Sequence, residues 1–319
     1  MSAGDVRGRF LWHELLTTDP DAASRFYAGV AGWETIHWEQ DSAYRLLATA
    51  GVPMAGLLSL SAEDRAGGGS SRWLTYIGVP DVDAAVRQAT AMGATVRAAA
   101  QDVPTVGRMA ELADPQGTAF AVYTPAGEQV PPEARTPGDF SWHELVTTNW
   151  QAAWEFYSKL FGWEYESSFD MGPAGTYWMF RRPGGKRALG GMYTKQPDQP
   201  GPPYWLPYVL VTSADRAGEA AIAAGGTILH GPVDVPGGDR IAMGSDPQGA
   251  AFAVHSLKPA PAKRPTRKAT RPAQVKKKVS KKKVSKKTVK RTAKKAAKRT
   301  PKRVARKVKA RARAKVKRR

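Results

Sequence analysis

The residues best suited to proton transfer form a His-Glu pair that occurs twice, as His13-Glu14 and as His143-Glu144. Side chains alternate along an extended strand, so the histidine and the glutamate of each pair must face opposite sides. If the preceding Trp12 faces a ligand, Glu14 faces it too and His13 points away. A carboxylate among tryptophans is partly desolvated, and its pKa rises toward the range useful for general acid–base catalysis.

Glu14 and Glu144 are therefore the candidate catalytic residues, and a structural interpretation stands beside this one. Each carboxylate could instead bridge to an arginine such as Arg108 or Arg240. For the histidines, the structural interpretation is a strand residue under a helix, hydrogen-bonded at its ring.

Two further side chains late in the chain have the strand parity to approach these glutamates. Tyr123 and His255 each stand two residues after an alanine of the repeated Ala-Phe-Ala-Val segment. His255 with Glu144 is a candidate acid–base pair, although two ligands are too few for a metal site. Aromatic walls suit a flat or apolar ligand, and for Trp73 and Trp205 the alternative is ordinary core packing. The candidate ligand-binding residues are Trp12, Trp73, Tyr123, Trp142 and Trp205.

These candidates sit in a duplicated body. The segment Phe10–Leu15 recurs at Phe140–Leu145, and Asp114–Gly117 recurs at Asp246–Gly249. The offset changes only from 130 to 132 residues, so chance does not explain the match. The predicted organisation is a first domain over 1–127, a proline-rich linker over 128–138, a second domain over 139–257 and a basic tail over 258–319.

Each copy contains two similar cycles of elements. In the first cycle a strand over residues 10–17 precedes a helix, for which Asp19 suits the N-cap and Pro20 the first turn. Gly32 ends that helix. The second cycle repeats the order, with a strand over 73–79 and a helix over 82–92. The predicted fold is α+β, with paired strand–helix–three-strand modules whose open sheet faces close into a cup.

This combination of an Asp or Asn cap, Phe-Tyr, Gly-Trp and a late Asp-Pro-Gln-Gly turn resembles the vicinal oxygen chelate superfamily. That superfamily includes glyoxalase I, bleomycin-resistance proteins and extradiol dioxygenases. The resemblance covers about residues 7–256 and implies two tandem glyoxalase-like domains of paired βαβββ modules. It further implies a cavity in each domain, often with a divalent metal.

The resemblance also indicates where metal ligands should stand, and this sequence lacks them. The superfamily places a histidine on the first strand of each module and a glutamate on the last strand. The matching positions here hold Trp12, Leu74 and Ala121 in the first copy, and Trp142, Leu206 and Ala253 in the second. Apolar side chains cannot bind a hard or borderline cation. We therefore predict no cofactor, with a divalent metal as the alternative.

Charge divides the chain of 319 residues into two unlike parts. The net charge is +21, yet the last 62 residues hold 31 Lys and Arg and no acidic residue, which leaves a net charge of −10 in the first 257. The absence of cysteine excludes disulfides and a thiol nucleophile. No apolar run approaches the ~20 residues of a membrane span, and no secretory signal opens the chain. These features predict a cytoplasmic protein.

The tail resembles the Lys/Ala-rich tails of linker histones and has too few apolar residues to fold alone. Without aromatic residues, it should bind DNA or another polyanion non-specifically, and DNA binding would place the protein in the nucleoid. Its candidate phosphate contacts are Lys276, Lys277, Lys278, Lys281, Lys282, Lys283, Lys286 and Lys287.

Two functions remain open at this point. In the first, the body binds or transforms a small molecule and the tail tethers it to DNA. In the second, the body is catalytically silent and the chain is a nucleoid-associated structural protein.

Overall fold

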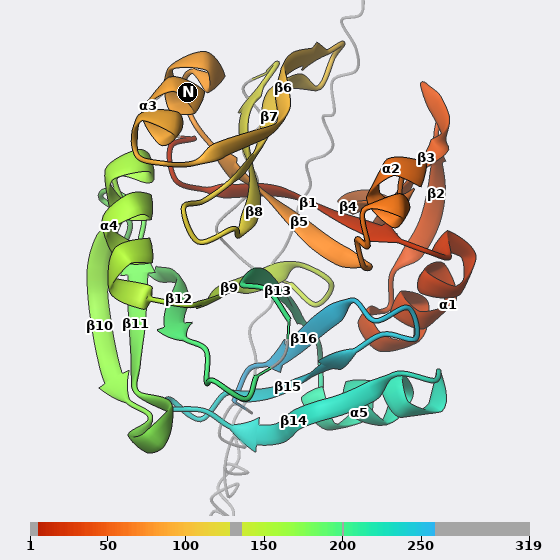
Figure 1. Ribbon diagram of the computed structural model, residues 1–319. Helices are drawn as coiled ribbons and strands as arrows, with labels where there is room; N and C mark the ends of the chain where they lie inside the picture. The colour runs from red at the N-terminus through yellow and green to blue at the C-terminus, as the bar shows by residue number, and fades with distance from the viewer. Residues whose placement is uncertain (1–5, 128–135, 200, 259–319) are drawn as a thin grey trace, which may run out of the picture. The chain divides into compact units, whose positions relative to one another are not determined.

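The computed structural model describes residues 6–127, 136–199 and 201–258 (Figure 1). Residues 259–319 of the predicted tail, which include its eight candidate phosphate-binding lysines, and residues 128–135 of the predicted linker lie outside these ranges. Among the described helices, none is long and apolar enough to cross a bilayer.

The first half follows the predicted order of elements. Its elements are β1 (Phe10–Thr17), α1 (Pro20–Ala31), β2 (Glu34–Trp38), β3 (Asp41–Thr49), β4 (Val52–Ser59), α2 (Ala62–Ala66), β5 (Arg72–Gly78), α3 (Val82–Ala91), β6 (Thr95–Val103), β7 (Gly107–Ala113) and β8 (Ala119–Pro125). The short α2 joins two βαβββ modules.

The second half repeats this order with two differences: a 3-10 turn joins its second and third strands, and no described helix corresponds to α2. Its elements are β9 (Phe140–Thr147), α4 (Trp150–Phe161), β10 (Glu164–Asp170), η2 (Gly172–Ala174), β11 (Thr176–Arg181), β12 (Ala188–Thr194), β13 (Tyr204–Leu210), α5 (Ala214–Ala223), β14 (Thr227–Asp234), β15 (Arg240–Ser245) and β16 (Ala251–Ser256).

Local sequence signals set the helix ends. The Asp19 carboxylate accepts a hydrogen bond from the Ala22 amide at 3.0 Å, and Gly32 ends α1 with φ of 72°. In α4, Asn149 caps Ala152 at 3.0 Å and Gly162 has the same φ. Both predicted boundaries of the first helix are confirmed, because a polar cap and a left-handed glycine act within a few residues.

Each half forms one eight-stranded sheet. The strand orders are β2-β3-β4-β1-β5-β8-β7-β6 and β10-β11-β12-β9-β13-β16-β15-β14. In both sheets the first strands of the two modules pair antiparallel at the centre, β1 with β5 and β9 with β13. The predicted α+β fold of paired modules is confirmed.

The halves meet through their helix-bearing faces. Helix α1 packs beside α5, and α3 beside α4 (Figure 1). The repeated Phe-Tyr and Asp-Pro-Gln-Gly motifs also join across the halves, because Tyr27 Oη donates to Asp246 at 3.3 Å and Tyr157 Oη to Asp114 at 3.0 Å. The first helix of each copy is thus hydrogen-bonded to a turn of the other copy.

The repeated histidines meet at the centre of this contact. His13 Nε2 lies 3.0 Å from His143 Nε2, and the His143 ring stacks on Phe10 with centroids 3.6 Å apart. His143 Nδ1 lies 3.2 Å from the Leu189 carbonyl oxygen. A neutral His143 that donates there must accept at Nε2, so His13 is the donor. The histidines therefore point away from the glutamates, as the strand alternation predicts.

Candidate functional site

The face of the first sheet that lies opposite His13, here called the first cup, holds Glu14 in a chain of hydrogen bonds. Tyr44 Oη donates to Glu14 Oε1 at 2.7 Å, and Tyr76 Oη to Oε2 at 2.5 Å. Trp12 Nε1 donates to Tyr44 Oη at 3.0 Å. The first cup consists of Trp12, Glu14, Leu16, Tyr44, Leu74, Tyr76, Met109, Glu111, Ala119, Ala121 and Tyr123.

The equivalent face of the second sheet, the second cup, keeps only part of this chain. Trp142 Nε1 donates to Tyr177 Oη at 2.8 Å, and Tyr177 Oη to Glu144 Oε2 at 2.9 Å. Tyr208 Oη contacts Met243 Sδ at 3.3 Å. The second cup consists of Trp142, Glu144, Tyr177, Tyr204, Leu206, Tyr208, Ile241, Met243, Ala251 and Ala253.

Burial affects the two glutamates differently. Glu144 is only 6% exposed, and its Oε1 has no hydrogen-bond partner. Desolvation raises the pKa of Glu144 to about 7, against the lowering effect of the Tyr177 and Tyr208 hydroxyls. Desolvation also raises the pKa of Glu14, which Tyr76 and Tyr44 oppose. A carboxyl that titrates near neutrality is suited to acid–base chemistry.

Two glycines make room for the tyrosines. Gly56 on β4 pairs with Glu14, and Gly191 on β12 pairs with Glu144. A Cβ at Gly56 would overlap the Tyr44 hydroxyl, and one at Gly191 the Tyr177 ring. Glycine inside a strand is typical of such a close approach, and this signal could have located the tyrosines from sequence. Sequence reasoning missed Tyr44, Tyr76, Tyr177 and Tyr208.

Arg108 and Arg240 do not bridge to the glutamates, so the structural interpretation is wrong for both arginines. Arg108 pairs with Asp83 and Asp102, both at 2.9 Å. Its counterpart Arg240 pairs with Asp215 at 2.8 Å and Asp234 at 2.9 Å. Both arginines find nearer carboxylates at the outer edges of the sheets, so tyrosine hydroxyls satisfy the glutamates instead.

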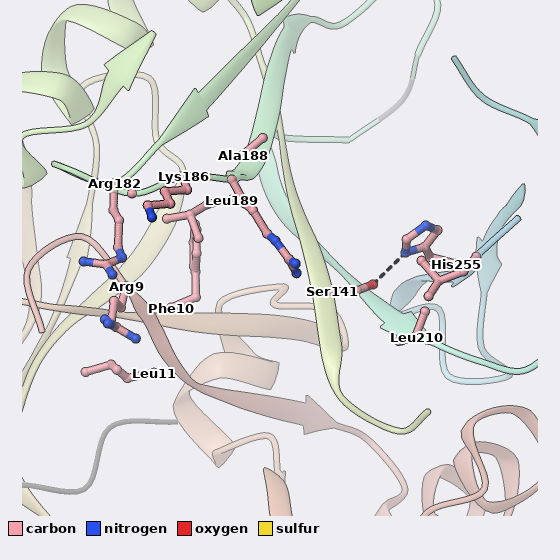
Figure 2. A pocket seen from close by; sticks show the side chains of 13 residues that line it. Arg9, Phe10, Leu11, Ser141, Arg182, Lys186, Ala188, Leu189, Leu210 and His255 are labelled. Atoms are coloured by element: carbon pink, nitrogen blue, oxygen red, sulfur yellow. Dashed lines mark hydrogen bonds between the residues drawn. The ribbon is translucent and has the colours of Figure 1, made fainter. Parts of the chain in front are cut away.

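His255 does not form the predicted pair with Glu144. Its Nδ1 lies 2.9 Å from Ser141 Oγ and its Nε2 lies 3.1 Å from Asp239 Oδ2. Strand β9 is irregular opposite Tyr208 and Val209, and Ser141 stands in that irregularity. The histidine ring thus lines a separate cavity, whose residues Figure 2 shows.

Tyr123 lies on the first cup as predicted, with its ring centroid 6.3 Å from that of Tyr76. Its hydroxyl donates to the Val106 carbonyl oxygen at 2.9 Å and not to Glu14. Its ring therefore lines the side of the cup. The concave positions of Trp12 and Trp142 also follow the prediction, and their binding of a ligand stays a prediction.

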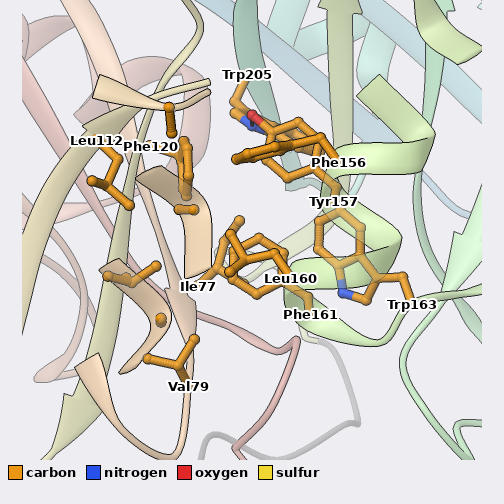
Figure 3. Close-up of a cluster of buried hydrophobic side chains, with 14 of the residues drawn as sticks. Ile77, Val79, Leu112, Phe120, Phe156, Tyr157, Leu160, Phe161, Trp163 and Trp205 are labelled. Atoms are coloured by element: carbon orange, nitrogen blue, oxygen red, sulfur yellow. Dashed lines mark hydrogen bonds between the residues drawn. The ribbon is translucent and has the colours of Figure 1, made fainter. Parts of the chain in front are cut away.

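Trp73 and Trp205 do not line the cups, and that interpretation is wrong. Trp73 pairs with Leu15, one position from the pair Glu14–Leu74, so it faces the opposite side of the sheet. Trp205 packs between the halves, in the cluster that Figure 3 shows. Their indoles donate to Tyr27 and Tyr157, at 3.3 and 3.2 Å. Ordinary core packing, the alternative interpretation, accounts for both.

The side chains of the cups do not fit a divalent metal. Trp12, Leu74 and Ala121 line the first cup at the positions where the superfamily would place ligands, and Trp142, Leu206 and Ala253 line the second. Within 6–127, 136–199 and 201–258, no three His, Asp or Glu side chains group closely enough to hold a metal ion. Both oxygens of Glu14 already accept tyrosine hydroxyls.

Solved structures share this architecture. The Mn(II)-bound glyoxalase from Novosphingobium aromaticivorans aligns with a TM-score of 0.55 and 18% identity, over 78% of this chain and 82% of that one. Homoprotocatechuate 2,3-dioxygenase from Brevibacterium fuscum aligns with a TM-score of 0.58 and 14% identity, over 79% and 81%. At these identities the likeness concerns the fold.

Sequence comparison is more specific. Residues 13–123 match the family described as glyoxalase-like domain, and residues 140–254 match the glyoxalase/bleomycin resistance protein/dioxygenase superfamily. A protein of Mycobacterium tuberculosis, putative glyoxylase CFP32, is 33% identical over 254 residues, 78% of this chain and 94% of that protein. The anthracycline biosynthesis protein DauV of a Streptomyces species is 28% identical over 263 residues, 78% and 93%. The chain therefore belongs to the glyoxalase/bleomycin resistance protein/dioxygenase superfamily, as two domains in tandem.

Proposed function

We propose that the second cup binds a flat organic molecule that carries a carbonyl group, and that Glu144 donates a proton to the carbonyl oxygen without a divalent metal. The observation that carries this proposal is the buried Glu144 Oε1, which accepts no hydrogen bond from the described residues, because the nearby Tyr208 hydroxyl, close enough to lower the pKa of Glu144, donates to Met243 Sδ. A buried polar atom without a partner is costly unless a ligand or water satisfies it.

The chemistry follows from the pKa of Glu144. With a pKa raised to about 7 by burial, the group is protonated over the lower half of the physiological range and can give or regain its proton. Tyr177 donates to Oε2, so the proton of the neutral acid resides on Oε1. A donor fixed at this position would polarise a carbonyl oxygen.

The shape of the ligand follows from the walls. Trp142, Tyr204 and Met243 are only partly buried on the concave face, so they are available to stack on a flat ring. The name of the relative DauV, an anthracycline biosynthesis protein, agrees with a polycyclic aromatic ligand. We assign the role of electrophile to the proton of Glu144.

The experiment uses the hydroxyanthraquinone quinizarin as a probe for the full chain, followed by tryptophan fluorescence quenching from pH 5.5 to 8.5. We expect the affinity of the wild type to fall as the pH rises through about 7. Glu144→Gln, whose amide remains a donor, should bind with no such dependence, and Glu144→Ala should bind about tenfold more weakly.

Glu14→Gln is the matched control and should follow the wild type. Binding of the wild type that is independent of pH, or an equal effect of Glu14→Gln, would contradict the assignment to Glu144.

We further propose that the tail tethers this body to DNA. The support is the run of 31 basic residues after an acidic body. Replacing the eight clustered lysines from Lys276 to Lys287 by glutamine should reduce the slope of log affinity against log salt by about 7. An unchanged slope would remove these lysines from the interface.

A catalytically silent body in a nucleoid-associated protein is the second candidate, favoured by the apolar residues at the ligand positions of the superfamily. It predicts salt-dependent DNA binding together with no binding of quinizarin.

A further inference from the structure

A cavity lies apart from the two cups, where the start of β1 meets the second half. Its volume is about 240 Å³, slightly below the ~300–1,000 Å³ of typical ligand pockets. None of its residues belongs to the second cup. Those lining it are Arg9, Phe10, Leu11, Ser141, Arg182, Gly185, Lys186, Arg187, Ala188, Leu189, Leu210, His255 and Leu257.

The charges around this cavity have one sign. Four of the lining residues are basic and none is acidic, although the first 257 residues carry a net charge of −10. In Figure 2, Arg9, Arg182 and Lys186 gather at one side, opposite Ser141 and His255. Arg9 and Arg182 are already engaged in other interactions, so Lys186 and Arg187 are the cations we assign to a ligand.

Lys186 and Arg187 occupy the turn between β11 and β12 and are solvent-exposed. Neither makes an ion pair with a described residue, whereas the neighbouring Arg181 pairs with both Glu164 and Glu166. The wall is apolar where Phe10, Leu189 and Leu210 line it. Cations at the rim of an apolar hollow suit a molecule with an acidic head and a hydrocarbon body.

The far wall adds a polar group whose orientation is fixed. His255 is held by Asp239 at 3.1 Å and by Ser141 Oγ at 2.9 Å. Ser141 Oγ also lies 3.3 Å from the Tyr208 carbonyl oxygen. Two contacts thus orient the serine hydroxyl and the imidazole before a ligand arrives, which reduces the cost of ordering them on binding.

We propose that this cavity binds a small organic anion, a carboxylate or phosphate monoester with an apolar body, through Lys186 and Arg187. The proposal does not depend on the function of the cups. A nucleic-acid backbone is the less suitable occupant, because its phosphates carry no apolar group that would fill the hollow between Phe10 and Leu210.

The experiment measures the thermal stabilisation of the full chain by phenyl phosphate and by benzoate, with benzyl alcohol as the neutral probe. A ligand raises the melting temperature only if it binds the folded chain more tightly than the unfolded chain. Anion binding that is equally strong to the folded and the unfolded chain therefore gives no signal. We expect stabilisation by both anions and none by benzyl alcohol.

The double variant Lys186→Met/Arg187→Met should weaken binding of phenyl phosphate at least about tenfold. Ala188→Leu, which fills the cavity and keeps every charge, should abolish it. The matched control Arg87→Met/Arg216→Met removes two exposed cations from α3 and α5 and should bind like the wild type.

Three outcomes would overturn the proposal. An equal loss in the matched control would indicate a general effect of net charge. Unchanged binding by Ala188→Leu would place the anion outside the cavity. Stabilisation by a DNA duplex that Lys186→Met/Arg187→Met abolishes, with none by phenyl phosphate, would make this face a polyanion surface instead.

Discussion

The first and second cups begin with the same chain of hydrogen bonds, from a tryptophan indole through a tyrosine hydroxyl to a glutamate, and they end differently. In the first cup Tyr76 completes the chain on Glu14 at 2.5 Å. In the second, the equivalent Tyr208 donates to Met243 Sδ, and its hydroxyl lowers the pKa of Glu144 without a hydrogen bond to Oε1, which has no partner among the described residues. The duplication has thus kept one saturated carboxylate and one with an unsatisfied oxygen.

The two cups also differ at one position of their last hairpin. Glu111 of the first cup corresponds to Met243 of the second, at the offset of 132 residues. Glu111 raises the pKa of Glu14 by like-charge repulsion, whereas the second cup offers a thioether at that place. The first cup is charged and closed by hydrogen bonds, and the second is aromatic and retains a polar atom for a ligand.

The largest expected effect concerns the pH dependence of stability. Folding raises the pKa of Glu144 from 4.5 to about 7, so the folded chain holds a proton that the unfolded chain has lost. The free energy of unfolding should therefore fall as pH rises from 4.5 through 7, by about 3 kcal/mol. Glu144→Gln should remove this loss, as urea unfolding at pH 5 and pH 8.5 would measure.

Glu14→Gln is the comparison variant, and it should recover less stability because Tyr44 and Tyr76 favour the ionised Glu14. Equal recovery by both variants would mean that the two carboxylates are buried at equal cost.

The next prediction concerns the two strand glycines that lie against Tyr44 and Tyr177. Gly191→Ala places a methyl group against the Tyr177 ring, and such overpacking costs about 1–3 kcal/mol. Gly56→Ala places a methyl group against the Tyr44 hydroxyl and the ring carbon that bears it, and should cost a similar amount. Chemical denaturation of both variants measures the two losses, and a loss near zero for either variant would contradict the close approach of its tyrosine.

A smaller effect compares the terminal tyrosines. Tyr76→Phe removes a donor to a carboxylate and should cost about 1.5 kcal/mol, whereas Tyr208→Phe removes a contact to sulfur and should cost about 0.5 kcal/mol. Thermal unfolding at pH 7.5 measures both. Equal losses would show that Tyr208 serves Glu144 as Tyr76 serves Glu14.

The smallest effect is electrostatic. Glu111→Met makes the first cup resemble the second and should lower the pKa of Glu14, because a like charge is removed. The reciprocal Met243→Glu should raise the pKa of Glu144 further. Carboxyl NMR titration of each variant measures the direction, and a shift of opposite sign would exclude coupling across the cup.

Local signals explain why much of the fold could be predicted from the sequence. The Asp19 cap and Gly32 define α1 within a few residues, and strand alternation correctly separates His13 from Glu14. The duplicated motifs predict two similar halves, because the same tyrosine–aspartate hydrogen bond forms twice between the halves.

The site was harder to predict because it depends on the pairing of distant strands. Tyr44 on β3 and Tyr177 on β11 each lie two strands away from the strand of the glutamate they contact, and no spacing within one strand brings them to the glutamates. The face of Trp73 follows from its register against Leu15, and the partner of His255 follows from an irregular residue in β9. The alternation of side chains along one strand predicts neither the face of Trp73 nor the partner of His255.

The proposal that Glu144 is the proton donor is tested most directly by the titration of Glu144 in the folded chain. A carbon-detected NMR titration of the glutamate carboxyls, assigned by comparison with Glu144→Gln, measures it. We expect a midpoint near 7 for Glu144. A midpoint at or below the ordinary value of 4.5 would contradict the proposed proton donor and the distinction between the cups.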